Sequence, residues 1–179
     1  MLLAGFDAGQ TSTRCRIGRW QDGRWEPVGD GYGPGVCHLA SAGGVERFQD
    51  AIRVSSTEAM NVHPDLTLDG AVMGASGIEQ GSIVQEQATD LLARTLALPM
   101  AQVLATGDER TALRGAFPNH AGIVVISGTG MICLGRNDQG VEHRCGGWGW
   151  LLDGAGSAFD IGHQGLQPVS YTHLTLPTT

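Results

Sequence analysis

The residues best placed to do chemistry lie near the start of the chain, where positions 5–13 read G-F-D-A-G-Q-T-S-T. An apolar run ends at Asp7, and the turn that follows leads into an alternating segment, a pattern that predicts a β-hairpin. The turn would aim N–H groups and hydroxyls at one point, through Gly9, Gln10, Thr11, Ser12 and Thr13. Asp7 could hold a cation beside them, which suits a metal–phosphate pair such as Mg²⁺ with a nucleotide. The alternative is an ordinary hairpin with a polar turn.

A second glycine–threonine turn lies far along the chain. Gly128, Thr129 and Gly130 separate two apolar segments, 122–127 and 131–136, which we expect to be paired strands. This repeats the strand, turn and strand of the first hairpin. Two such turns facing each other could clamp a polyphosphate from both sides, and the inference depends on the pair rather than on either turn alone.

A second acid, Asp108, follows an apolar strand predicted at 102–106 and begins a helix predicted to end near Ala116. Sheets of parallel strands place ligands at the carboxyl ends of their strands, so Asp108 is a candidate catalytic acid. The alternative is a helix N-cap, a common use of aspartate.

Two glycine-rich stretches are candidate substrate loops. Residues 29–38 contain too much glycine for regular structure and end at Cys37 and His38; the alternative is a flexible connection. Residues 146–162 begin with Gly146 and Gly147, and Ser157 introduces a helix from 158 to about 166. Such a helix N-terminus suits an anion or a sugar hydroxyl, and the alternative is a structural turn with its two tryptophans in the core.

The remaining pattern predicts the elements that must position these residues. A short third strand at 24–28 contains Pro27 and therefore belongs at a sheet edge. Helices are predicted at 43–62 and 82–98, with a buried strand at 66–75 between them. Three antiparallel strands followed by alternating helices and strands indicate an α/β fold with a mixed sheet.

Charge and cysteine usage narrow the possible partners. The net charge of −7 and the pI of about 5.2 argue against nucleic acid and against a membrane surface, since both prefer a basic face. The apolar start lacks the features of a signal peptide and no segment is long enough to span a bilayer, so we expect a reduced, cytoplasmic setting. A zinc site built from Cys37, His38, Cys133, His143 and Cys145 is conceivable, but without a C-x-x-C pair plain thiols are preferred.

Three motifs together resemble a known family. They are F-D-A-G-Q-T-S-T at 6–13, I-S-G-T-G at 126–130, and C-G-G-W-G-W-L-L at 145–152 with G-S-A-F-D-I-G at 156–162. In this order they resemble the sugar kinases of the actin, hexokinase and heat-shock-chaperone superfamily, and more closely the N-acetylglucosamine kinases of the BadF/BadG family. The resemblance covers residues 2–167. It implies a ribonuclease H-like domain with helices on both faces of its sheet, plus the start of a second similar domain.

The resemblance also implies a reaction, the transfer of the ATP γ-phosphoryl group to a sugar hydroxyl with Mg²⁺ as cofactor. Asp7 would hold Mg²⁺, residues 9–13 and 128–130 would be the two phosphate loops, and Asp108 would accept the proton of the sugar hydroxyl. Sugar contacts would fall at Cys37, His38, Gly146, Gly147 and Ser157. The full-length protein is expected to be a homodimer.

This chain departs from the family pattern in ways that leave the sugar open. Cys37-His38 stands where the family usually has asparagine, and the family's G-D-E-G-S is here D-G-A-G-S at 153–157, which lacks an acid expected to contact the sugar. Glu109 and Arg110 follow Asp108 in place of small residues. An amino sugar or another hexose is therefore expected.

The family is about twice as long as the native part of this chain, so we expect an amino-terminal fragment that is inactive alone. The expected organisation is one domain at 1–118, a truncated second domain at 119–167, and a non-native tail at 168–179 that resembles a translated adapter and continues no helix. Two other functions remain open. One is an activator ATPase of 2-hydroxyacyl-CoA dehydratases, which would need cysteines for an iron–sulfur cluster. The other is a sugar-sensing module without catalysis, which the altered 153–155 segment favours.

Overall fold

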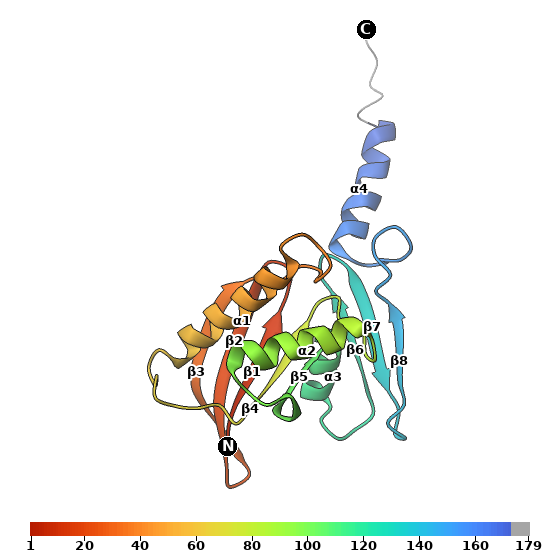
Figure 1. The fold of residues 1–179 in the computed structure, drawn as a ribbon. Coiled ribbons are helices and arrows are strands. Elements are labelled where there is room, and N and C mark those ends of the chain that lie inside the picture. Colours follow the sequence, from red (N-terminus) through yellow and green to blue (C-terminus); the bar gives the residue numbers. More distant parts are fainter. Residues whose placement is uncertain (173–179) are drawn as a thin grey trace. The chain divides into compact units, whose positions relative to one another are not determined.

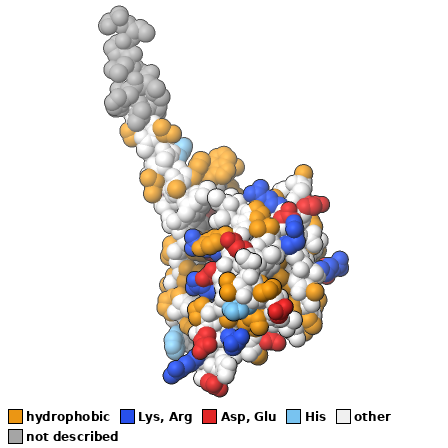
Figure 2. All heavy atoms as spheres, turned by 90° about the vertical axis from the view of Figure 1, so that its left-hand side faces the viewer, with side chains coloured by type: hydrophobic (Ala, Val, Ile, Leu, Met, Phe, Trp, Pro, Cys, Tyr) orange, Lys and Arg blue, Asp and Glu red, His pale blue; other side chains and the backbone are white. Residues whose placement is uncertain are grey.

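A computed structural model describes residues 1–172 of the chain, which forms two compact units, Met1–Thr111 and Ala112–Thr179 (Figure 1). Each unit is built on its own sheet. Along the face of the molecule in Figure 2, acidic and basic side chains lie interspersed.

The first unit contains a five-stranded mixed sheet in the order β3-β2-β1-β4-β5. Its strands are β1 (Leu2–Ala8), β2 (Ser12–Gln21), β3 (Arg24–Pro34), β4 (Gly70–Ala75) and β5 (Val103–Thr106). β1, β2 and β3 pair antiparallel, whereas β4 lies parallel to β1 and β5 lies parallel to β4. The predicted mixed sheet, with its third strand at an edge, is confirmed.

Helices cover both faces of this sheet. α1 (Gly44–Met60) and α2 (Ile83–Leu96) pack on one face and bury Phe48, Ile52 and Leu92 against the strands. A short 3-10 helix, η1 (Met100–Gln102), precedes β5. α3 (Asp108–Ala116) lies on the other face. Successive residues of a strand face opposite sides of the sheet, so Gly74 faces the side opposite to the buried Met73, and the Thr111 side chain of α3 fills the space beside Gly74.

The glycines of β3 correct one prediction. Residues 29–34, predicted to be irregular, continue β3, which runs to Pro34. A Cβ at Gly29, Gly31 or Gly33 would lie 2.0, 2.1 or 2.8 Å from a backbone carbonyl oxygen of α1, those of Ala59, Ser55 and Ala51. Glycine therefore serves here for close packing of a helix on a strand, not for irregular backbone.

The strand predicted at 66–75 begins only at Gly70. The segment before it is tied to the start of β1 instead: the Asp69 carboxylate accepts a hydrogen bond from the Leu2 N–H at 2.6 Å, and the Asp69 N–H donates to the Leu2 carbonyl at 2.8 Å. Leu66 and Leu68 pack on the core without belonging to a strand.

The second unit contains a three-stranded antiparallel sheet, β6 (Gly122–Ser127), β7 (Met131–Arg136) and β8 (Glu142–Gly146), followed by α4 (Ala158–Thr172). The predicted start of this helix is right. The predicted break at Pro168 is wrong, because α4 continues through this proline to Thr172. A proline inside a helix removes one backbone hydrogen bond without necessarily ending the helix. Positions 173–179 of the predicted tail lie outside the described residues.

Candidate functional site

In the first unit, the two predicted acids, Asp7 and Asp108, lie at the same end of the sheet, where the parallel strands have their C-terminal ends. Asp7 is level with Gly74 of β4, and Gly74 is level with Thr106 of β5, two residues before Asp108. Neighbouring strands are about 4.8 Å apart, so the two strand positions lie about 10 Å apart across this edge. The three parallel strands therefore bring Asp7 and Asp108 to the same end of the sheet.

The Asp7 carboxylate is exposed and has no ion-pair partner among residues 1–172. The residue opposite it on β2 is Arg14, whose guanidinium instead lies over the ring of Tyr32, 5.7 Å from its centroid. Exposed carboxylate oxygens are ligands that Mg²⁺ accepts. The end of β1 therefore offers a single carboxylate to a hard cation.

The turn after Asp7 offers two backbone donors. The Gly9 N–H closes the turn by donating to the Ser12 carbonyl at 3.0 Å. The N–H groups of Gln10 and Thr11 enter no hydrogen bond within the described part of the chain. Consecutive N–H groups of this kind form an anion-binding concavity.

Thr13, at the end of the turn, is fully buried, and its hydroxyl donates to the Pro34 carbonyl at 2.8 Å. It therefore braces the turn against the end of β3. Its predicted contact with phosphate remains a prediction.

The predicted substrate loop lies beside the same turn. The Val36 N–H donates to the Gly9 carbonyl at 2.9 Å, and Val36 is buried. Cys37 and His38 follow directly, half-buried and exposed respectively, and the His38 Nδ1 accepts a hydrogen bond from the Ala40 N–H at 3.2 Å. The structure thus brings the predicted sugar-contacting pair next to the predicted phosphate turn.

Asp108 is the first residue of α3 and is half-buried. The Gly107 carbonyl accepts the N–H groups of Arg110 and Thr111 at 3.1 and 3.3 Å, so Gly107 rather than Asp108 holds the N-cap position. Asp108 Oδ1 accepts the Glu109 N–H at 3.0 Å. The Asp108 carboxyl group also interacts with the carboxyl group of its neighbour Glu109 through a side-chain hydrogen bond.

The second glycine–threonine turn, in the second unit, has the same character as the first. The Gly128 N–H donates to the Gly130 carbonyl, and the Gly128 carbonyl accepts the Ala158 N–H, both at 2.9 Å. The N–H groups of Thr129 and Gly130 make no hydrogen bond with residues 1–172. A Cβ on either glycine would meet nothing within 4 Å, so a ligand could approach the backbone.

The other predicted sugar contacts have clear structural roles of their own. Gly146 and Gly147 have positive φ angles of 80° and 78°, which favour glycine. Ser157 is buried and caps α4, because its Oγ accepts the Asp160 N–H at 3.1 Å. Asp160 in turn accepts the Gly156 N–H at 2.8 Å, which, with the bond from Gln164, holds the pKa of its carboxyl below the usual range. Contact of these residues with a sugar remains a prediction.

The tryptophans between these residues do not belong to a core. Trp148 and Trp150 are 63% and 68% exposed, so the alternative in which they pack inside the unit is wrong. The Arg144 guanidinium lies 4.2 Å from the centroid of the Trp148 ring, and the Trp150 ring contacts Phe159.

Residues 4–173 match the model of the BadF/BadG/BcrA/BcrD ATPase family. This chain belongs to that family. The five-stranded order of its first unit and the repeated hairpin of its second are the fold of solved relatives. A candidate N-acetylglucosamine kinase from Chromobacterium violaceum superposes with a TM-score of 0.70 at 23% identity over 94% of this chain, and one from Porphyromonas gingivalis with 0.72 at 17% identity over 99%.

Two curated relatives of this BadF/BadG-family chain are similar in sequence. The N-acetylmuramic acid/N-acetylglucosamine kinase of Clostridium acetobutylicum is 40% identical over 89 residues, which are 50% of this chain and 27% of that protein. The N-acetyl-D-glucosamine kinase of Dictyostelium discoideum is 33% identical over 136 residues, 73% of this chain and 41% of that protein. The chain also covers 57% and 58% of the two solved structures, so it spans little more than half their length.

Sequence reasoning treated Glu109 only as a departure from the BadF/BadG pattern and did not anticipate its burial beside Asp108. Glu109 is 6% exposed, and its Oε1 pairs with the Arg110 Nη1 at 2.7 Å. Burial is the main cause that raises the pKa of Glu109, and the hydrogen bond and charge of the Asp108 carboxyl group raise it further. A backbone hydrogen bond and the charge of Arg110 act in the opposite direction. A Cβ at Gly107 would lie 2.2 Å from the Glu109 carboxylate, a proximity that the sequence alone does not indicate.

The cysteines of this family member are free thiols: Cys15, Cys37, Cys133 and Cys145. Cys133 and Cys145 are register partners on β7 and β8. Among the described residues, no group of three or more His, Cys, Asp and Glu side chains could hold a metal ion. Likewise, no described helix has the length and apolar character needed to cross a membrane.

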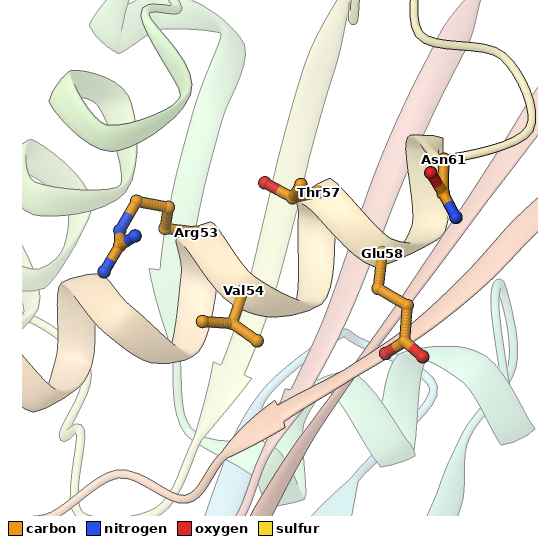
Figure 3. Close-up of a pocket in the computed structure, with 5 residues that line it drawn as sticks. All are labelled: Arg53, Val54, Thr57, Glu58 and Asn61. Atoms are coloured by element: carbon orange, nitrogen blue, oxygen red, sulfur yellow. The ribbon is translucent and has the colours of Figure 1, made fainter.

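A shallow hollow on α1 lies apart from the candidate site (Figure 3). Its lining residues are Arg53, Val54, Thr57, Glu58 and Asn61. α1 runs past β3 so that Ala51 faces Gly33, near the phosphate turn, and Ala59 faces Gly29. The hollow therefore extends along the C-terminal half of α1, and it contains none of the predicted site residues.

Proposed function

We propose that this chain is the amino-terminal part of an ATP-dependent kinase that phosphorylates a hydroxyl group of an N-acetylglucosamine-like amino sugar or a related hexose. One observation carries the proposal: Asp7, the turn with unused N–H groups at Gln10 and Thr11, and Asp108 all lie at one edge of the sheet. The kinase names of both curated relatives support it. The coverage of half their length or less supports the view that a further part completes the enzyme.

Each site residue then has a task. Asp7 would hold Mg²⁺, and the ion would supply positive charge to the phosphoryl oxygens of ATP. In the first unit, the N–H groups of Gln10 and Thr11 bind phosphate oxygens without reorganisation, since no hydrogen bond among the described residues occupies them. The turn of the second unit is taken by itself as a candidate for phosphate binding through the N–H groups of Thr129 and Gly130.

Asp108 acts as the general base. Its half-buried carboxylate, beside the buried Glu109, accepts the proton of the sugar hydroxyl as the hydroxyl oxygen attacks the γ-phosphorus and ADP leaves. In the first unit, Cys37 and His38 orient the sugar. In the second unit, the backbone at Gly146 and Gly147 and the Ser157 hydroxyl are separate candidates for sugar contact. The bond from Val36 to Gly9 links the sugar loop to the phosphate turn, which keeps the two substrates in a fixed relation.

The test is a phosphorylation assay on the protein extended to the length of its relatives, with N-acetylglucosamine, N-acetylmuramic acid, glucosamine and glucose as acceptors. We expect transfer to an amino sugar, and we expect Asp108→Asn to lower kcat by about 10²–10⁴-fold with little change in sugar affinity. The control is Asp90→Asn, a half-buried aspartate on α2 whose ion-pair partner is Arg94 at 3.0 Å.

Three outcomes separate the alternatives. Near-normal turnover of the Asp108→Asn protein would remove Asp108 from the base role. Sugar binding without phosphorylation by the unaltered protein would instead indicate a sugar-sensing module. Iron and a brown colour after anaerobic purification would indicate an activator ATPase.

The 179-residue chain itself is expected to show no transfer and to bind ATP weakly, because only part of the nucleotide site is present in it. Isothermal titration of the chain with Mg²⁺ and ATP measures this directly. Micromolar affinity would contradict the proposal that a further part of the protein is needed.

A further inference from the structure

Arg47, in the first turn of α1, contacts both loops of the candidate site. Its Nε donates to the Gly35 carbonyl at 2.6 Å, and its Nη2 donates to the Gln10 carbonyl at 3.4 Å. Gly35 begins the loop that leads to Cys37 and His38, whereas Gln10 belongs to the phosphate turn. Nothing in the sequence pattern connects these three positions, which lie up to 37 residues apart.

The two loops that Arg47 bridges are already in backbone contact. A Cβ on Gly35 would lie 2.2 Å from the Gln10 carbonyl oxygen, so only glycine fits there without a shift. Beside this contact, the Val36 N–H donates to the Gly9 carbonyl at 2.9 Å. The planar guanidinium can donate to two carbonyls at once, which a lysine ammonium on a flexible stem does far less well.

These bonds determine where the phosphate turn points its donors. In a planar trans peptide the C=O and N–H groups point in opposite directions, and there is no cis peptide among the described residues. The Gly9 carbonyl and the Gln10 N–H belong to one peptide group, so the bond from Val36 directs the Gln10 N–H away from Val36. By the same reasoning, the bond from Arg47 to the Gln10 carbonyl directs the Thr11 N–H away from Arg47.

We propose that Arg47 is a positioning residue that fixes the Gln10–Thr11 peptide, so that the Thr11 N–H remains available to an anionic oxygen, and that it ties this peptide to the substrate loop through Gly35. The inference deepens the proposed function and rests on it for the identity of the anion as an ATP phosphate. Arg47 touches no substrate in this scheme. It prevents rotation of the Gln10–Thr11 peptide. When a bound sugar orders the loop at 35–38, Arg47 also orders the phosphate turn, because it is bonded to both.

The kinetic test uses the protein at the length of its relatives, with Arg47→Met and Arg47→Lys, and with Arg53→Met as control. Arg53 lies on the same helix, and its ion-pair partner is Asp50. We expect Arg47→Met to lower kcat/KM for ATP by about 30–100-fold, the scale expected for a misplaced donor in an active site. Arg47→Lys should fall between Arg47→Met and the unaltered protein, and Arg53→Met should stay within twofold of the latter.

The coupling of the two loops gives a readout that a merely structural role would not move. In the unaltered protein, bound sugar should raise ATP affinity, and in Arg47→Met this increase should shrink towards onefold because the link through Gly35 is lost. An Arg47→Met protein whose kcat/KM for ATP and sugar effect both stay within threefold of the original would overturn the inference. Should Arg47→Met fail to fold, Arg47→Lys decides by the same two measurements.

A second test does not depend on kinase activity and uses the 179-residue chain. Backbone ¹⁵N relaxation should show an order parameter near 0.85 at Thr11, falling below about 0.6 in Arg47→Met, while the strand residues stay rigid. An unchanged value at Thr11 would refute the positioning role even if the kinase is active. Conversely, loss of order at Thr11 in a protein that phosphorylates no sugar would contradict the proposed function and leave the role of Arg47 intact.

Discussion

Replacement of Gly31 by alanine tests whether the glycines of β3 exist to let α1 approach. The new Cβ would lie 2.1 Å from the Ser55 carbonyl oxygen and 2.5 Å from the Ala59 nitrogen. Both are backbone atoms of α1, so no side chain can rotate out of the way. Ordinary contact begins near 3.4 Å, so α1 must move outward by about 1.3 Å.

The loss in free energy of unfolding follows from the core side chains that α1 contributes. Phe48 and Ile52 are 1% and 0% exposed, and an outward movement of the helix loosens both against the sheet. Overpacking of a filled core costs about 1–3 kcal/mol, and rigid backbone on both sides places this change near 3 kcal/mol. For a chain of this size that corresponds to a fall in Tm of about 6–12 °C.

Urea unfolding followed by circular dichroism measures the change, with Gly5→Ala as the matched control. Gly5 lies in the same sheet on β1, and a Cβ there comes no nearer than 3.9 Å to the Arg16 carbonyl oxygen. The control also accounts for the effect of alanine on the unfolded chain, about 0.4–1 kcal/mol. A difference below about 1 kcal/mol between the two variants would refute the packing argument.

Three further predictions concern other parts of the chain. Burial, with a contribution from Asp30, raises the pKa of Cys15 to about 12, so an alkylating reagent should modify the exposed Cys145 first, and prompt labelling of Cys15 would contradict this. Because the thiol of the unfolded chain ionises near 9.0, the free energy of unfolding should decline as the pH rises from 9 towards 12. Ser82→Ala removes the oxygen that accepts the Gln85 N–H at 3.1 Å and should lower the unfolding free energy by about 1 kcal/mol in the same urea assay. The pKa of Asp160 is lowered, so its stabilising effect on the start of α4 is complete above pH 3.8 and is lost as the pH falls through the pKa of the folded state. The amide resonance of Gly156, which donates to Asp160, should shift on acidification, and it should not shift in Asp160→Asn.

Much of the fold was predictable because its signals are local. Alternating apolar residues mark the two hairpins, and Ser82 and Pro99 mark the ends of α2 closely. The continuation of β3 was not predictable in this way, because glycines in a strand remove the side-chain alternation that identifies it. Their reason lies in a helix about 20 residues further along, which only the tertiary structure reveals.

The residues of the candidate site also differ in whether a local sequence signal or only a tertiary contact identifies them. Asp7 and Asp108 could be placed together because the carboxyl ends of parallel strands meet at one edge. Arg47 could not, because an exposed arginine on a helix gives no sign that it reaches two loop carbonyls. α4 likewise runs past Pro168, where the sequence suggests an end.

The packing of Glu109 against Gly107 makes substitutions at these two positions depend on each other. The three nearest atoms to a Cβ on residue 107 all belong to the Glu109 carboxyl group, at 2.2–2.5 Å. These atoms are the far end of a flexible side chain, so a side chain gained at 107 would push the Glu109 carboxylate aside and disturb its pair with Arg110 at 2.7 Å. The effect of a side chain at 107 therefore depends on which residue stands at 109.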